Sequence, residues 1–135
     1  MTAVDTNVLV RLLTGDDPEQ AAAARAVFAA GSVWIAKTVM LESEWVLRRA
    51  YGFEQGAIRE AFTGLLGLSN VQVEDAATVA SALELMRHEV DFADALHLSS
   101  RPAGVSFVSF DPAFVRRAKR AGAMNVSVAP TRFNH

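Results

Sequence analysis

The chain contains the stretch Thr2-Ala3-Val4-Asp5-Thr6-Asn7-Val8-Leu9, in which an acid and an amide separate two apolar segments. The first segment has the length of a short buried strand, and the apolar residues from Val8 to Leu13 recur at helical spacing. We therefore expect a strand that ends before Asp5 and a helix that follows directly. Polar groups at such a junction are costly to bury unless they find partners.

Similar junctions recur along the chain. We expect further strands at Ser32–Ala36, Asn70–Val73, Val105–Phe110 and Val126–Ala129, and helices at 18–30, 38–50, 54–68, 76–88, 91–101 and 113–121. Asp17 before Pro18 and Asp111 before Pro112 are typical of an N-cap and first helical residue, and Thr38 is expected to cap a helix. Five strands alternating with helices predict an α/β domain with a mostly parallel sheet, whose ligands bind at the carboxyl ends of the strands.

The composition is that of a globular protein. The 135 residues are 51% hydrophobic and 21% charged, so we expect one domain over 1–135 with 130–135 as a flexible tail. The absence of Cys excludes thiol chemistry, and no signal peptide or apolar membrane span is visible, so we expect a cytoplasmic protein that does not bind a membrane. With a net charge of −2, any nucleic acid must be held by local basic patches.

Four acids share one kind of position. Each lies where an apolar segment gives way to a helix or in a helix's first turns: Asp5, Glu42, Asp94 and Asp111. Carboxylates brought close together raise each other's pKa unless a cation neutralises them, and hard divalent cations such as Mg²⁺ prefer oxygen ligands. If these helix starts face one sheet edge, the pattern predicts a metal site.

Each acid also has a structural explanation. Acids at helix starts contribute about 1 kcal/mol as caps and through the helix dipole, and we assign Asp91, three residues before Asp94, mainly to such a capping role. Glu42 and Glu44 project from faces about 200° apart, so only one can enter a given pocket. Glu42 neighbours the apolar pair Leu41 and Trp45, which favours it as the inward acid.

The chain resembles the PIN-domain ribonucleases, and within them the VapC-type toxins of bacterial toxin–antitoxin pairs. The matching stretches are residues 4–13, Leu41-Glu42-Ser43-Glu44-Trp45-Val46-Leu47, Asp91-Phe92-Ala93-Asp94-Ala95-Leu96-His97 and Ser109-Phe110-Asp111. They follow the family's order and spacing over nearly the whole chain. Each stretch alone is a weak signal, whereas the four together are specific.

The resemblance implies a three-layer sandwich with a central five-stranded, mostly parallel sheet flanked by helices. It implies that Asp5, Glu42, Asp94 and Asp111 bind Mg²⁺, with Mn²⁺ able to substitute, and that Thr6 and Asn7 orient the cluster through hydrogen bonds. Ser109 keeps the hydroxyl of the Thr that the family often has there. By analogy the acid directly before Ala-Leu, Asp94, is the ligand. The implied partners are RNA, a small antitoxin protein and a second copy of the chain.

The expected reaction is hydrolysis of an RNA phosphodiester by a metal-activated water. Candidate phosphate contacts, each of which is equally well explained as part of a solvated helix face, are Arg11, Arg48, Arg49, Arg116, Arg117, Lys119 and Arg120. His88, His97 and His135 form no convincing catalytic set. The aromatic residues Trp34, Trp45, Phe53, Phe62, Phe107 and Phe110 are expected to pack in the core rather than to stack on bases.

Two other functions fit the same residues. A Mg²⁺-dependent phosphohydrolase would use Asp5 as its nucleophile, but a second Asp is then expected at the position that Asn7 occupies. A catalytically silent interaction module would keep the acids only for metal-assisted stability or partner binding. Comparing RNA cleavage by the wild type and by an Asp5→Asn variant separates the nuclease from the silent module.

Overall fold

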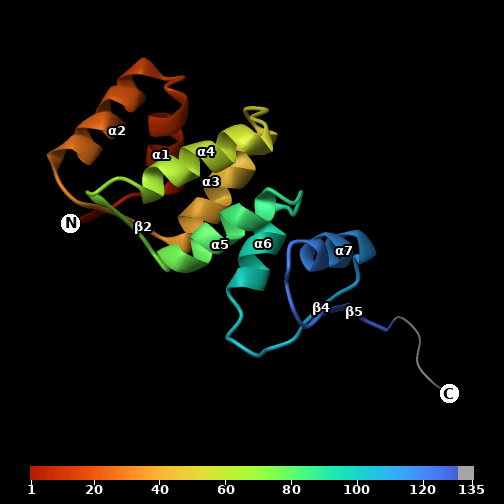
Figure 1. Cartoon of the computed structure of the whole chain (residues 1–135). Helices are drawn as coiled ribbons and strands as arrows, with labels where there is room; N and C mark the ends of the chain where they lie inside the picture. Colours follow the sequence, from red (N-terminus) through yellow and green to blue (C-terminus); the bar gives the residue numbers. More distant parts are fainter. Residues whose placement is uncertain (131–135) are drawn as a thin grey trace. The chain divides into compact units, whose positions relative to one another are not determined.

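The computed structural model describes residues 1–130 and contains seven helices and five strands in that range (Figure 1). The chain divides into two compact units, a first unit of Met1–Ala80 and a second unit that begins at Ser81. No helix in the described range is long and apolar enough to cross a membrane. Residues 131–135, which include His135 and almost all of the expected tail, lie outside the described residues.

The first unit is built around a three-stranded parallel sheet of order β1-β2-β3. Its strands are β1 (Thr2–Ala3), β2 (Val33–Ile35) and β3 (Val71–Val73), and its helices are α1 (Thr6–Thr14), α2 (Pro18–Ala30), α3 (Lys37–Arg49) and α4 (Gln55–Leu66). Helix α1 packs against α2 and α3. The apolar core of this unit includes Leu9, Ile35, Leu47 and Phe62, which are completely buried.

The second unit begins within α5 (Ala76–Met86), which crosses the boundary between the units. It continues with α6 (Phe92–Ser99), β4 (Phe107–Ser109), α7 (Pro112–Arg120) and β5 (Val126–Val128). Strands β4 and β5 are parallel, and α7 contacts both of them. Phe107 and Phe114 meet edge to face at 5.7 Å between ring centroids, which fixes α7 on this small sheet.

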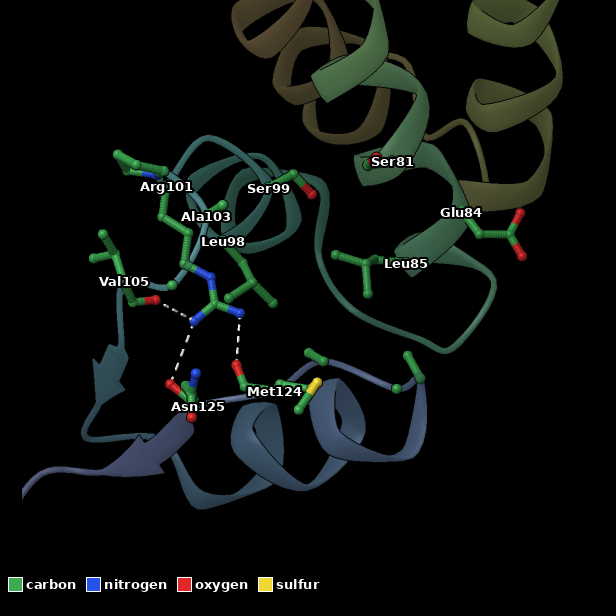
Figure 2. Close-up of a pocket in the computed structure, with 15 residues that line it drawn as sticks. Ser81, Glu84, Leu85, Leu98, Ser99, Arg101, Ala103, Val105, Met124 and Asn125 are labelled. Atoms are coloured by element: carbon green, nitrogen blue, oxygen red, sulfur yellow. Dashed lines mark hydrogen bonds between the residues drawn. The ribbon is translucent and has the colours of Figure 1, made fainter.

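Arg101 ties two loops of the second unit together (Figure 2). Its guanidinium donates hydrogen bonds to the carbonyl oxygens of Val105, Met124 and Asn125 at 2.8, 2.6 and 3.3 Å. These loops border a cavity of about 660 Å³ that is also lined by Leu85 of α5. The three bonds hold the loop before β4 beside the loop before β5, so the cation has a structural role here.

Several helix boundaries follow from capping residues, as the sequence predicts. Asp17 accepts a hydrogen bond from the backbone N–H of Gln20 and Pro18 is the first residue of α2. Gly15 ends α1 with a left-handed φ of 64°, a conformation in which a side chain would be strained. The prediction that Thr38 caps α3 is wrong, because α3 begins at Lys37 and Ala36 occupies the cap position.

The expected α/β fold with parallel strands is confirmed, but one part of that prediction is wrong. The five strands form a three-stranded sheet in the first unit and a two-stranded sheet in the second, rather than the single five-stranded sheet that we expected. The strands are only two or three residues long, so each sheet is small.

Two of the six aromatic residues predicted to lie in the core are on the surface. Trp45 is 54% exposed and Phe110 is 73% exposed, whereas Phe62 is fully buried as predicted. Trp34, Phe53 and Phe107 are half-buried. Apolar character at helical or strand spacing therefore located the apolar elements but did not decide which aromatic side chain faces inward.

Candidate functional site

Asp5 lies directly between β1 and α1 and caps the helix. Its Oδ1 accepts a hydrogen bond from the backbone N–H of Val8 at 3.0 Å, as expected for an N-cap residue. Oδ2 accepts no hydrogen bond from any residue in the range 1–130. One carboxylate oxygen thus holds the start of α1, and the other has no hydrogen-bond partner among the described residues.

Glu42 of α3 is joined to the same helix start. The hydroxyl of Thr6, the first residue of α1, donates a hydrogen bond to Glu42 Oε1 at 2.5 Å. This bond links two of the predicted acids, since Thr6 follows Asp5 in the chain. Asn7 was expected to orient the acids in the same way, but its side chain makes no hydrogen bond within the described residues and instead lines a cavity of about 170 Å³ with α2.

The prediction that Glu42 is the inward acid of its pair is wrong in one respect. Glu42 is exposed, and Glu44 is the buried acid, with 1% of its surface accessible. Arg48 Nε donates to Glu44 Oε2 at 2.8 Å, which gives the buried carboxylate a partner one helical turn away. The spacing of Glu44 and Arg48 in the sequence was the signal for this ion pair. Glu42 therefore remains the acid of this helix that solvent can reach.

Asp111 repeats the geometry of Asp5 in the second unit. It lies between β4 and α7, and its Oδ1 accepts hydrogen bonds from the backbone N–H groups of Ala113 at 3.0 Å and Phe114 at 3.2 Å. The hydroxyl of Ser109 accepts a hydrogen bond from the Asp111 backbone N–H at 3.0 Å, which fixes the residue at the end of the strand. Oδ2 of Asp111 also accepts no hydrogen bond within residues 1–130.

Asp94 lies in the first turn of α6, where its pKa is affected by burial and by the charges of nearby acids. Partial burial raises the pKa of Asp94 above its ordinary value, and the negative charges of Asp91 and Asp111 raise this pKa further. The neighbouring His97 opposes this effect by lowering the same pKa. Asp91 occupies the N-cap position of α6, but its side chain makes no capping hydrogen bond, so the predicted capping role is wrong.

The donor set of these acids suits a hard cation. Asp5 and Glu42 lie in the first unit, while Asp94 and Asp111 lie in the second, and all present carboxylate oxygens. No group of three or more His, Asp or Glu side chains within residues 1–130 is arranged to hold a metal ion. Each unit thus contains two of the four predicted acids.

Two of the basic residues predicted to contact RNA have structural partners. The guanidinium of Arg11 donates to Asp16 at 2.8 Å and to Gln20 and Tyr51, also at 2.8 Å, which ties α1 to the loop before α2 and to the end of α3. Arg48 is paired with the buried Glu44. In contrast, Arg49 and the four cations of α7 are exposed and form no ion pair with another described residue.

In a comparison with known protein families, residues 2–120 of the chain match the family described as PIN domain. The match includes all four acids and both units. PIN domains have a nuclease-type fold, are commonly nucleases and generally use divalent metal ions. No curated protein and no solved structure matches the chain.

Proposed function

Since the chain belongs to the PIN-domain family, we propose that it is a Mg²⁺- or Mn²⁺-dependent endoribonuclease and the toxin of a type II toxin–antitoxin pair. The proposed ligands of the metal are Asp5, Glu42, Asp94 and Asp111. Thr6 and Ser109 are proposed to position these acids. Asp91 adds negative charge beside Asp94. Asn7 is proposed as a further supporting residue in the first turn of α1.

The observation that carries this proposal is the placement of the acids at strand ends and helix starts within each unit. In the first unit, Thr6 connects Glu42 to the helix start that Asp5 caps. In the second unit, burial raises the pKa of Asp94, and the charges of Asp91 and Asp111 raise it further. A divalent cation would offset the repulsion between the acids of the second unit.

The chain's own residues have defined tasks in the proposed reaction. The free Oδ2 atoms of Asp5 and Asp111 and the exposed carboxylate of Glu42 would hold the cation, while the helix caps keep the two aspartates from rotating. The cation supplies activation of a water for attack on phosphorus and offsets the charge that develops on the phosphate. The α7 cations Arg116, Arg117, Lys119 and Arg120, with Arg49, would hold the RNA backbone.

The proposed partners follow the family resemblance. We propose a homodimer and a small antitoxin protein that covers the active-site groove, in a cytoplasmic setting without a membrane partner. Because Arg11 and Arg48 already have partners within the first unit, we assign them to the structure and not to the substrate.

The test is cleavage of a panel of structured RNAs by the wild type and by Asp5→Asn, with and without Mn²⁺. Asn caps helices about as well as Asp, so this variant keeps the start of α1 and loses only the charge. We expect Mn²⁺-dependent cleavage by the wild type and none by the variant. Equal activity of both proteins would indicate a contaminating nuclease and would support the catalytically silent module.

A further inference from the structure

Trp45 is a large apolar side chain that the fold leaves in solvent. More than half of its surface is exposed, while its helix neighbours Ser43, Glu44 and Leu47 are buried. An exposed indole in the middle of a well-packed helix is not needed for the core of its unit. The exposure of Trp45 therefore indicates a role other than packing in the first unit.

The exposed face of α3 on which Trp45 lies is polar apart from the indole. Thr38, Glu42, Trp45 and Arg49 are all exposed and lie at helical spacing, within about 60° of one another around the axis. We call this set the α3 face. Trp45 lies about 4.5 Å along the axis from Glu42, and Arg49 about 10.5 Å from it.

We propose that Trp45 is the base-stacking residue of the RNA-binding site and that Arg49 holds an adjacent phosphate. This inference rests on the proposed nuclease function, since Glu42 on the same face is one of the proposed metal ligands. An indole one turn from a metal-binding carboxylate can hold the base next to the scissile phosphate, with its ring against the base. Trp45 is thus a positioning residue, and it favours nucleotides whose bases are unpaired and free to stack.

The chemistry of the α3 face favours RNA over a protein partner. The other exposed members of this face are a threonine, an acid and a cation, so the indole is not part of a large contiguous apolar patch of the kind that marks a protein-docking surface. Arg49 makes no hydrogen bond or ion pair with another described residue, so its charge is available to a phosphate. An isolated indole beside such a cation is the arrangement that single-stranded nucleic acid recognises.

The experiment compares the wild type with Trp45→Ala, Trp45→Phe and Leu68→Ala. Leu68 is 46% exposed, so Leu68→Ala is the control variant that also removes exposed apolar surface. Affinity is measured by fluorescence anisotropy in EDTA with a labelled single-stranded RNA of about 12 nucleotides, and with the same strand in a duplex. Cleavage of the single strand with Mn²⁺ provides kcat and KM, and sedimentation reports the oligomeric state of each variant.

We expect Trp45→Ala to weaken binding of the single strand by roughly 5- to 150-fold, the range that loss of one base stack gives. KM should rise while kcat changes little, the duplex should bind as before, and Trp45→Phe should keep most of the affinity. In a Trp34→Phe variant, Trp45 is the one remaining tryptophan. RNA should quench its fluorescence, which tests contact between Trp45 and RNA without replacing Trp45.

Three results would overturn the inference. If the wild type cleaves RNA and Trp45→Ala binds the single strand equally well, Trp45 does not stack on the substrate and the nuclease proposal is unaffected. If Trp45→Ala dissociates a dimer while RNA affinity stays unchanged, the indole belongs to a protein interface. If the wild type neither binds nor cleaves any RNA, the proposed function itself is wrong.

Discussion

Glu42 and Glu44 are two residues apart on one helix and have opposite surroundings. Glu42 is exposed and accepts from Thr6, while Glu44 is buried against Arg48. The sequence analysis favoured Glu42 as the inward acid because it neighbours Leu41 and Trp45, but Trp45 is 54% exposed, so this apolar pair did not mark the buried side of the helix. What decided the outcome was the position of Arg48, which can neutralise Glu44 but not Glu42.

This contrast predicts opposite effects for two conservative substitutions. Glu42→Gln keeps an acceptor for Thr6, so the free energy of unfolding should change by less than about 0.5 kcal/mol. RNA cleavage should fall more than about 100-fold, because even outer partners of metal ligands typically contribute 10- to 100-fold. Glu44→Gln should instead destabilise the protein by about 1 to 3 kcal/mol, since Arg48 then loses its charged partner.

Urea denaturation and RNA cleavage assays on the two variants test this division. The result that would count against it is a Glu42→Gln protein with full activity, or a Glu44→Gln protein that loses cleavage while its stability is unchanged.

Asp94 predicts a dependence of stability on pH. Its pKa is raised in the folded protein above the ordinary value of 3.8, so the folded state holds the proton more tightly than the unfolded state does. The free energy of unfolding therefore falls as the pH rises from 3.8 through the raised pKa, and the loss is complete above it. Below pH 3.8 the carboxyl group is protonated in both the folded and the unfolded state, so Asp94 no longer makes the free energy of unfolding depend on pH.

Without divalent cations, Asp94→Asn should become more stable relative to the wild type as the pH increases from about 3 to 7. Mg²⁺ should narrow this difference at pH 7, because the cation favours the ionised carboxylate. Thermal unfolding of both proteins across pH, with EDTA and with Mg²⁺, measures the effect. A constant difference between the two proteins at all pH values would contradict the account.

At the scale of elements, helix and strand positions were predictable wherever local residues set them. Asp5, Asp17 and Asp111 cap α1, α2 and α7 as the sequence indicates, because an N-cap depends on residues three or fewer positions away. The start of α3 was missed because its cap is not local. The Lys37 backbone N–H donates to Glu74 Oε1 at 2.8 Å, from a residue 37 positions away.

Helix α7 is the element that we assign to the RNA backbone. Phe114, Val115 and Ala118 face its unit's core, while its four cations point to solvent. Arg116→Gln with Arg120→Gln should weaken RNA binding and reduce the slope of log affinity against log salt by about 1.4, or about 0.7 for each phosphate that the variant no longer neutralises. Binding titrations between low and physiological salt concentration give this slope.

Arg25→Gln with Arg87→Gln is the matched control for α7. Both residues are exposed, and the pair removes the same number of charges from α2 and from the turn after α5. If the control changes the slope as much as the α7 variant does, the attraction to RNA is general and α7 does not bind the RNA backbone.

At the scale of the whole molecule, the proposed metal site depends on acids from distant parts of the chain. Asp5 and Glu42 lie in the first compact unit, and Asp94 and Asp111 lie in the second.

The same scale explains how far the site could be predicted. The sequence could predict that Asp5 and Asp111 lie between a strand and a helix, because strand ends and helix starts are local features, and both residues do lie there. Metal binding by the four acids stays a prediction. The exposure of Trp45 could not be predicted, because it depends on which face of α3 the rest of the first unit covers.

The central proposal is that Asp5, Glu42, Asp94 and Asp111 bind a divalent cation. Crystals of the protein soaked in Mn²⁺ and measured near the manganese absorption edge test this proposal most directly. We predict an anomalous peak bonded to carboxylate oxygens of these acids. The absence of a peak within bonding distance of these carboxylates would contradict the proposal.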